Sequence, residues 1–558
     1  MSLSSACHDV AGCPAKLSAR ISGKPAKGVL KRRRFLAGSA ASLAAPAIAR
    51  ARDSSVLKFV PLSDLPSLDP IWVPAYTTRA HAFMVFDTLY GQAGAAQDFA
   101  AMPQMVAGHT IENDGRAWTL TLRDGLLFHD GTKVLARDCV ASIRRWGARD
   151  QFGQTLMQRT DTLTAPDDRT VLFRLTRPFP MLPDALGKFG VNMCPIMPER
   201  LANTDPFRQV TEVVGSGPFQ FDSSEAVSGA RYVYKRFARY LPREEGKADF
   251  ISGPKIAHFD RIEWQVNPDQ TSATEALRSG EIDWIEAPPD GVLPLLRNDP
   301  AISLQRAGAT GSWGLMRPNC LYPPFDNPAI RRAVLGAIDQ SDFMAAVIGP
   351  DPAGSHVPTG YFPPDSPMAS ESGLAALTGP RNLLRARDEL RTAGYRGEQV
   401  VVIIPANLSR VRVLSEVAVD LLRKLGMNVD EQISDGASWA RRLISKKAPD
   451  QGGWNIFCTA LQGTDAMSPA SHAALRGNGD LAFPGWPSSA QTELLRNEWL
   501  EAPDTRSQRR IAAAIQAQAF MDVPYYPLGT FYPSTAFRSN LTGILDGQAI
   551  FWNLRRTG

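Results

Sequence analysis

Residues 399–433, QVVVIIPANLSRVRVLSEVAVDLLRKLGMNVDEQI, place a helical pattern between two runs that favour strands. The run from Gln399 to Ile404 is rich in β-branched residues, as strands usually are. The apolar residues that follow recur at helical spacing and share one face: Leu414, Val417, Ala418, Leu421, Leu422 and Leu425. Gly426 ends this helix, and Met427 to Ile433 returns as a second strand. The stretch predicts a βαβ unit, whose two strands run parallel.

Shorter strand and helix patterns alternate along the rest of the chain. Trp118 to Arg123 alternates apolar and polar residues, as a strand with one buried face does. Further strands are expected at 56–60, 170–175, 231–234 and 261–266, and helices at 80–89, 136–146, 490–500 and 505–520. This alternation favours an α/β fold with a second sheet centre in the later half of the chain.

The composition is that of a globular protein, with 44% hydrophobic and 21% charged residues. Its 558 residues allow two to four domains of roughly 100–200 residues. Nine basic residues and one acid lie in residues 1–51, whereas the remainder has 52 basic and 55 acidic residues, a net charge of −3. Because the body of the chain has no excess of basic residues, nucleic acid is not an expected partner.

The first 51 residues have the order of a secretory signal. Arg32, Arg33 and Arg34 precede Phe35-Leu36, an apolar run at 37–45 and the sequence Ala47-Ile48-Ala49. Consecutive arginines before Phe-Leu resemble the twin-arginine export motif. The apolar run is too short to span a membrane, and no cysteine directly follows it to carry a lipid. We interpret residues 1–51 as a twin-arginine-type signal peptide and expect a soluble periplasmic protein; a basic surface helix is the alternative interpretation.

Four cysteines lie beyond this segment: Cys139, Cys194, Cys320 and Cys458. They lack the C-x-x-C spacing that is typical of zinc sites. In an oxidising compartment, Cys139 could pair with Cys194 and Cys320 with Cys458. Buried free thiols are an equally good interpretation.

Sequence motifs for catalysis are missing. The chain has neither G-x-S-x-G nor G-x-x-x-x-G-K-[ST], and its seven histidines occur singly, without the spacing of metal ligands. His129 and Asp130 are adjacent, but they lie in a Phe-His-Asp-Gly turn, where a structural role is favoured over catalysis. We therefore expect no enzyme activity, no cofactor and no metal.

Aromatic residues beside polar turns suit the lining of a ligand cleft, because a ring offers a large apolar face at low entropic cost. Six residues are of this kind: Trp72, Tyr76, Trp313, Tyr322, Trp454 and Trp486. For each of them, ordinary packing in the core is the competing interpretation.

Several segments together resemble family 5 of the extracytoplasmic solute-binding proteins, which serve bacterial peptide and nickel ABC importers. They are LPSLDP at 65–70, FDTLY at 86–90, LRDGLLFHDG at 122–131, GSGPF at 215–219 and FDNPAIRRAVLGAIDQ at 325–340. The segments 523–528 and 551–555 are similar to the closing part of that family. The resemblance covers nearly all of residues 53–556.

The resemblance implies a two-lobed α/β fold like that of periplasmic binding proteins, of type II and similar to cluster C. Lobe one would comprise 52–310 and 525–558, with an extra small subdomain at about 91–210, and lobe two would comprise 311–524. Such lobes close on a solute by hinge motion. A monomer that delivers a small or peptide-like solute to an inner-membrane ABC permease is therefore implied. The alternatives are a secreted enzyme of an unrelated class and a binding protein that serves a sensor or acts as a holdase.

The expected ligand-binding residues are Tyr76 from lobe one and Trp313, Gln462, Asp465 and Trp486 from lobe two. In peptide-binding members of the family, an acid in a loop of lobe two receives the amino group of the peptide. The resemblance places Gln462 at this position, and an amide cannot supply the charge that holds a buried ammonium. Asp465 could take over this role, and a turn-forming residue is its other interpretation. Nickel binding through histidine has no special support.

Overall fold

Strands β15 (Gln399–Pro405) and β16 (Asn428–Ser434) pair in parallel around helix α12 (Ser409–Lys424), which confirms the predicted βαβ unit. Leu414 and Leu422 are completely buried on the inner face of α12, whereas Val417 is only half-buried beside them. The middle of the predicted apolar face is therefore fully buried, and its edge is only partly buried.

The computed structural model describes residues 55–266, 269–349 and 352–557, all of which belong to one compact unit, Ser54–Gly558. The signal peptide predicted at residues 1–51 lies outside the described residues. None of the described helices has the length and apolar character that crossing a membrane requires.

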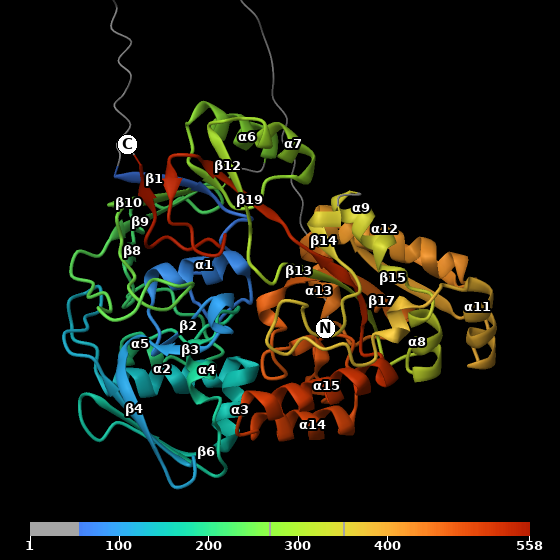
Figure 1. Ribbon diagram of the computed structural model, residues 1–558, viewed down its shortest axis with the longest axis horizontal. Coiled ribbons are helices and arrows are strands. Elements are labelled where there is room, and N and C mark those ends of the chain that lie inside the picture. Colours follow the sequence, from blue (N-terminus) through green and yellow to red (C-terminus); the bar gives the residue numbers. More distant parts are fainter. Residues whose placement is uncertain (1–54, 267–268, 350–351, 558) are drawn as a thin grey trace, which may run out of the picture. The chain divides into compact units, whose positions relative to one another are not determined.

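Two large mixed sheets form the framework of this unit (Figure 1). The seven-stranded sheet defines what we call lobe one, and the six-stranded sheet defines lobe two. The strand order in lobe one is β12 (Ile302–Arg306), β19 (Ser534–Arg538), β11 (Trp284–Ile285), β1 (Val56–Val60), β10 (Arg261–Gln265), β9 (Arg231–Arg236) and β8 (Phe219–Phe221). The order in lobe two is β14 (Ser355–His356), β18 (Tyr526–Phe531), β13 (Ser312–Pro318), β17 (Ile456–Gln462), β15 and β16.

Helices cover both sheets, and the core of lobe one is aromatic. Phe59 packs edge-on against Trp284 and Phe551, with ring centroids 4.9 Å away in each case. The helices of lobe one are α1 (Tyr76–Val85), α6 (Gln270–Ser279) and α7 (Leu293–Arg297). Those of lobe two include α8 (Pro328–Leu335), α9 (Gln340–Ile348), α10 (Ala375–Thr378), α11 (Leu383–Thr392), α12, α13 (Gly436–Leu443), α14 (Ala490–Leu500) and α15 (Thr505–Asp522).

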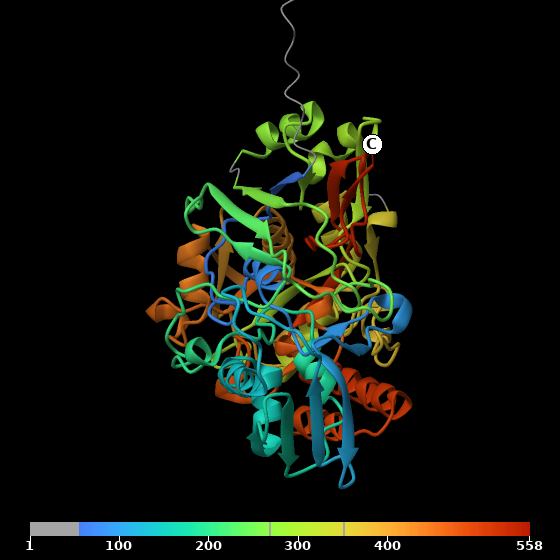
Figure 2. The same ribbon diagram turned by 90° about the vertical axis from the view of Figure 1, so that its left-hand side faces the viewer.

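A smaller four-stranded sheet extends from lobe one, as Figure 2 shows from the side. Its strand order is β4 (Val106–Glu112), β5 (Ala117–Leu122), β7 (Thr170–Leu175) and β6 (Thr160–Thr164). Helices α2 (Ala136–Arg149), α3 (Gln151–Arg159), α4 (Leu182–Gly187) and α5 (Glu199–Ala202) and the ribbon of β2 (Tyr90–Gln92) and β3 (Ala101–Pro103) accompany it. All of these elements fall close to the segment 91–210, for which the family resemblance implies a subdomain.

The chain passes between the two large sheets after β12 and again after β18. β12 ends at Arg306 and β13 begins at Ser312, on either side of the boundary expected at 310. The second passage differs from the expected boundary at 525, because β18 pairs with β13 and β14 in the sheet of lobe two. All six residues of β18 are buried between these neighbours. By strand pairing, the return to lobe one lies between Phe531 and Ser534.

Helix α1 begins earlier than the sequence pattern indicates. It runs from Tyr76 to Val85, whereas the expected helix covers 80–89. The backbone of Phe86 is extended, and this ends the helix. Tyr76 consequently lies in the first turn of a helix, four residues before the expected start.

The four cysteines of the described chain are free thiols, so the structure has neither of the two expected pairings. Cys139, Cys194 and Cys458 are buried, and Cys320 is partly buried. Burial raises the pKa of the Cys458 thiol to about 12. These are the properties of the buried thiols that the sequence left as the alternative.

Asp69 of the LPSLDP segment holds lobe one together from inside. Its carboxylate accepts two hydrogen bonds from the Arg145 guanidinium, at 3.1 and 2.7 Å, and one from the Val210 backbone N–H at 2.8 Å. The side chains of Asp69 and Arg145 are 0% and 2% exposed. The loop, helix α2 and the segment near 210 are thus joined at one buried charge pair.

We expect Asp69→Asn to lower the free energy of unfolding by about 3–5 kcal/mol, because it leaves the Arg145 charge buried without its partner. Urea titration measures this change. Glu389→Gln is the matched control: it removes an exposed ion pair with Arg385, at 2.8 Å, and should cost under about 1 kcal/mol. Equal stability of the two variants would contradict the role given to Asp69.

Candidate functional site

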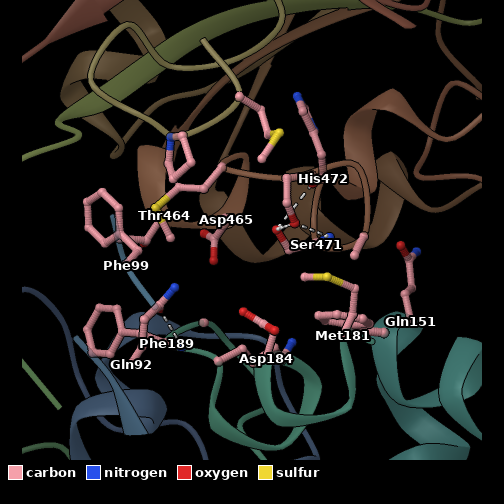
Figure 3. A pocket seen from close by; sticks show the side chains of 18 of the residues that line it. Gln92, Phe99, Gln151, Met181, Asp184, Phe189, Thr464, Asp465, Ser471 and His472 are labelled. Atoms are coloured by element: carbon pink, nitrogen blue, oxygen red, sulfur yellow. Dashed lines mark hydrogen bonds between the residues drawn. The ribbon is translucent and has the colours of Figure 1, made fainter. Parts of the chain in front are cut away.

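A cavity of about 740 Å³ is lined by side chains from both lobes. This volume lies within the usual range of small-molecule sites. Lobe one contributes residues from 98–101, 149–152 and 180–192, and lobe two contributes residues from 461–474 and 502–508. Figure 3 shows side chains from the two lobes facing each other across this space.

Tyr76 connects the two lobes at the wall of the cavity. Its hydroxyl donates to the Asp465 carboxylate at 2.8 Å and accepts from the backbone N–H of Gln462 at 2.8 Å. Burial, together with the nearby Asp465 charge, raises the pKa of Tyr76 well above its usual value. The hydroxyl therefore stays protonated and can make both hydrogen bonds.

Arg79 lies one turn further along α1 and is almost completely buried. Its Nη2 donates to the side-chain oxygen of Gln462 at 2.8 Å, and its guanidinium lies 4.0 Å from the ring centre of Phe189. Burial lowers the pKa of Arg79, and the nearby Asp465 carboxylate opposes this shift. An arginine remains charged in such surroundings, so Arg79 is a fixed cation behind the cavity wall.

Asp465 ends the short 3₁₀ helix Gly463–Asp465, directly after β17. Burial raises its pKa, while the charge of Arg79 and the hydrogen bond from Tyr76 act in the opposite direction. Part of the Asp465 charge is thus already compensated by the chain itself.

Three of the five expected binding residues, Tyr76, Trp313 and Asp465, line the cavity. Gln462 does not: its side chain pairs with Arg79 and its N–H with Tyr76. Trp486 does not line it either, because its ring packs 5.7 Å from that of Trp454 in a buried cluster. For Trp486 the competing interpretation of core packing is the one that the structure supports.

The expected set omits several residues that the structure brings to the site: Arg79, Asp184, Lys188, Phe189 and His472. Arg79 had no signal in the sequence beyond following Tyr76 by three residues, because it precedes the helix expected at 80–89. The others lie on loops and short helices, whose positions depend on the tertiary fold.

His472 contributes a neutral ring to the wall. Burial lowers its pKa to about 3, and its Nε2 lies 2.9 Å from the Tyr361 carbonyl oxygen. The ring packs edge-on against Trp313 at 5.3 Å. Among the described residues, no group of three or more His, Cys, Asp or Glu is arranged to hold a metal ion.

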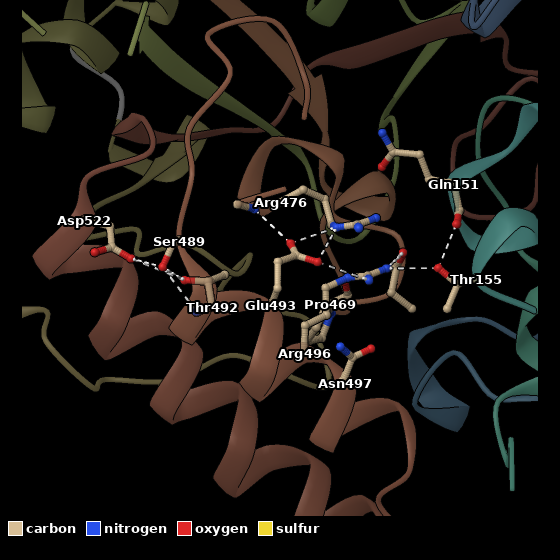
Figure 4. Close-up of polar contacts among 12 residues, drawn as sticks. Gln151, Thr155, Pro469, Arg476, Ser489, Thr492, Glu493, Arg496, Asn497 and Asp522 are labelled. Atoms are coloured by element: carbon tan, nitrogen blue, oxygen red, sulfur yellow. Dashed lines mark hydrogen bonds and ion pairs between the residues drawn. The ribbon is translucent and has the colours of Figure 1, made fainter. Parts of the chain in front are cut away.

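A second contact between the lobes joins α3 to the region of α14 (Figure 4). Arg496 donates to the Pro469 carbonyl oxygen at 2.7 Å and lies 3.5 Å from the Thr155 hydroxyl of lobe one. Arg159 of α3 donates to the Asn497 side chain at 3.2 Å. Burial lowers the pKa of Arg496 to about 9.

A third contact is an ion pair. Arg410 of α12 makes two hydrogen bonds, at 2.7 and 3.0 Å, to the carboxylate of Asp290 in lobe one. Together with the contacts at Tyr76 and Arg496, this pair holds the two lobes in one arrangement around the cavity.

The chain matches the family model described as bacterial extracellular solute-binding proteins, family 5, over residues 100–490. It belongs to this family. The chain is 33% identical over 547 residues to y4tO of Sinorhizobium fredii, named as a probable peptide ABC transporter periplasmic-binding protein. The alignment covers 95% of this chain and 99% of that relative.

Solved structures show the same fold at low identity. AgaA of A. tumefaciens R10, solved with agropinic acid, is 20% identical with a TM-score of 0.75, covering 90% of this chain and 99% of that one. DppA of Helicobacter pylori, solved with the peptide STSA, is 19% identical with a TM-score of 0.75, covering 90% and 98%. The two-lobed α/β fold expected from the sequence is confirmed.

This family 5 member is therefore an extracellular solute-binding protein. Its family consists of binding proteins, so the alternative of an enzyme on an unrelated fold is not supported. The site described above, a cavity lined by two lobes, is of the kind that such a protein requires.

We expect Tyr76→Phe to open the lobes, because it leaves the Gln462 N–H and the Asp465 carboxylate without their shared partner, a cost of about 1–3 kcal/mol. Small-angle X-ray scattering should give a larger radius of gyration for this variant without solute. Tyr322→Phe is the control, since its hydroxyl donates to the Lys446 carbonyl within lobe two at 2.7 Å. An unchanged radius for Tyr76→Phe would show that this hydroxyl does not hold the lobes.

Proposed function

We propose that this protein captures a small peptide-like solute in the cavity between its lobes and delivers it to an inner-membrane ABC permease. The observation that carries the proposal is the cavity itself, whose walls come from both lobes. The extensive similarity to the peptide transporter component y4tO supports the peptide class and the permease partner.

The mechanism that we propose is closure of the lobes on the solute. A ligand shifts such an equilibrium only by its difference in affinity for the two forms, and a solute that touches both lobes prefers the closed form. The contacts at Tyr76, Arg496 and Arg410 join the lobes through side chains of the chain itself. The solute therefore adds to an existing set of closing contacts, and the closed surface is what the permease recognises.

The walls of the cavity suit a solute with variable apolar groups. Phe99, Phe152, Met181, Trp313 and Trp499 line it and supply aromatic and thioether surface. Such side chains bind apolar groups without a strict shape requirement, and methionine adapts its conformation most easily. This arrangement favours a peptide-like molecule over a sugar, which needs many hydrogen-bonding partners.

Each expected residue then has its own role. Tyr76, Trp313 and Asp465 contact the solute, since they line the cavity. Gln462 acts through Arg79 and Tyr76, whose positions it fixes. Trp486 supports the sheet of lobe two through its contact with Trp454. Binding and release require no bond of the solute to change, so the proposed role needs neither catalysis nor a cofactor. We propose that the protein acts as a monomer.

Native mass spectrometry of the periplasmic protein, purified without refolding, tests the solute class. We expect a retained molecule that yields amino acids on hydrolysis. Trp313→Ala should lose it, because the wall then lacks an aromatic face, whereas Tyr322→Phe should retain it. A retained sugar or other molecule without amino acids would contradict the peptide class.

We also propose export by the twin-arginine route, on the basis of Arg32 to Arg34 and the apolar run that follows. The triple variant Arg32→Lys, Arg33→Lys and Arg34→Lys should remain in the cytoplasm, since the paired arginines are the element that this route reads. Cell fractionation measures the distribution. Lys31→Arg keeps the arginines and is the control; normal export of the triple variant would contradict the route.

A further inference from the structure

Among the described residues, most acids and the lysine on the cavity wall have a hydrogen-bond or ion-pair partner in another part of the chain, and Asp184 differs from them. The Lys188 ammonium pairs with Asp150 and donates to the Val191 carbonyl oxygen at 3.1 Å. Asp504 accepts from the Ser507 backbone N–H at 2.7 Å at the start of α15. Asp465 accepts from Tyr76.

Two further charged residues line the cavity, and one of them is largely exposed to solvent. The Arg149 guanidinium donates to the Trp72 carbonyl oxygen at 3.2 Å and lies 5.3 Å from the Trp72 ring centre. Asp98 is 76% exposed and lies 3.9 Å from Arg509. Arg149 is thus held by a carbonyl oxygen and an aromatic ring, and Asp98 is an acid at the exposed surface.

Asp184 is the exception. It lies in the first turn of α4, and Figure 3 shows its carboxylate pointing into the cavity, toward the side that carries Asp465. Within the described part of the chain, its only hydrogen-bond donor is its own backbone N–H. A carboxylate without a counter-charge in a poorly solvated site is costly, and a cation that binds there removes this cost.

We propose that Asp184 is the carboxylate that receives the cationic group of the solute, an ammonium or a guanidinium. This inference rests on the proposed function and deepens it, because it assigns a positive charge to the solute and a residue of lobe one to its recognition. Asp465, the acid expected for this role from the sequence, is less suitable. It already accepts the Tyr76 hydroxyl and lies under the charge of Arg79.

The ionisation of Asp184 supports this assignment. Burial raises its pKa to about 7. The other titratable or charged groups on the cavity walls are Tyr76, Asp98, Arg149, Asp150 and Lys188 in lobe one and Asp465, His472 and Asp504 in lobe two. A cation bound at Asp184 lowers this pKa again, so binding at pH 6 should release a proton from the carboxyl group.

The same shift predicts how Asp184 affects stability. A carboxyl group whose pKa is higher in the folded protein than in the unfolded chain stabilises the fold at low pH, and this contribution is lost as the pH rises through the folded value. At pH 8 the ionised Asp184 therefore lowers the stability of the protein without solute. Asp184→Asn should therefore raise the melting temperature at pH 8. If Asp184 only stabilised the start of its helix, the same substitution would lower the melting temperature.

The first experiment offers the protein a pool of dipeptides built from the twenty amino acids, and the same pool after N-acetylation. Acetylation removes every ammonium but leaves the arginine guanidinium. We expect capture from the free pool, and capture only of arginine-containing peptides from the acetylated pool. Asp184→Asn should lower the affinity for the captured peptides at least about 30-fold, as loss of one partner of a buried charge pair does.

Glu199→Gln is the matched control, because Glu199 is an acid in the first turn of the short helix α5, is 44% exposed and does not line the cavity. It should leave the captured set and its affinities unchanged. Equal capture of neutral acetylated peptides would overturn the role of Asp184 but leave peptide binding intact. Capture of no peptide from either pool would instead overturn the proposed function and, with it, this inference.

The second experiment is calorimetry of one captured peptide at pH 6, in two buffers that differ in ionisation enthalpy. We expect release of up to one proton for the wild type and for Glu199→Gln, and none for Asp184→Asn. Release that persists in Asp184→Asn and disappears in Asp465→Asn would assign the cation to Asp465 and overturn the proposal. A lower melting temperature of Asp184→Asn at pH 8, with unchanged affinities, would reduce Asp184 to a structural residue.

Discussion

The two hydrogen bonds of the Tyr76 hydroxyl are the interaction on which the closed cavity depends. One atom of lobe one satisfies a backbone N–H and a carboxylate of lobe two at the same time. A buried polar group that loses its partner costs more than the bond contributes, so this junction is either fully formed or strongly disfavoured. It therefore gives the lobes one defined closed arrangement, not a range of loosely closed ones.

The wall on the side of lobe two depends on a second buried group, Arg317 of β13. Its guanidinium donates to the carbonyl oxygens of Ala474, Phe483, Pro484 and Pro524 at 2.7–3.0 Å. Burial lowers the pKa of Arg317 to about 10, which leaves it charged at neutral pH. Two of these carbonyls belong to residues that line the cavity, so one strand residue positions loops that have no regular structure of their own.

The parts of the fold that follow local patterns could be predicted from the sequence. The βαβ unit at 399–433 and the helices α14 and α15 have a clear period, and the structure contains them with nearly the expected bounds. The point after β18 at which the chain returns to lobe one could not be placed from the sequence. A completely buried strand shows no alternation of apolar and polar residues that would assign it to one sheet or the other. Strand pairing, a property of the tertiary fold, decides it.

The site divides in the same way. Tyr76 and Trp313 could be selected because aromatic residues suit a cleft, and Asp465 because the family resemblance points to its loop. The argument from aromatic residues also selects Trp486, which packs in the core. An aromatic residue has equal reason to be in either place, and the sequence does not say which face of lobe two it occupies. Asp184 had no distinguishing signal, since an acid in the first turn of a helix is ordinary.

A binding protein has a physical reason to keep such an unpaired acid. If every polar group in the cavity were satisfied by the chain, as Asp150 is by Lys188, the empty closed form would carry no penalty for the solute to remove. Solute would then shift the lobes only through its own contacts with both of them, because the shift equals the difference in affinity between the two forms. A carboxylate that is costly in the empty closed cavity and compensated in the filled one increases this difference. The cost in stability of the empty protein thus makes closure depend more strongly on the solute.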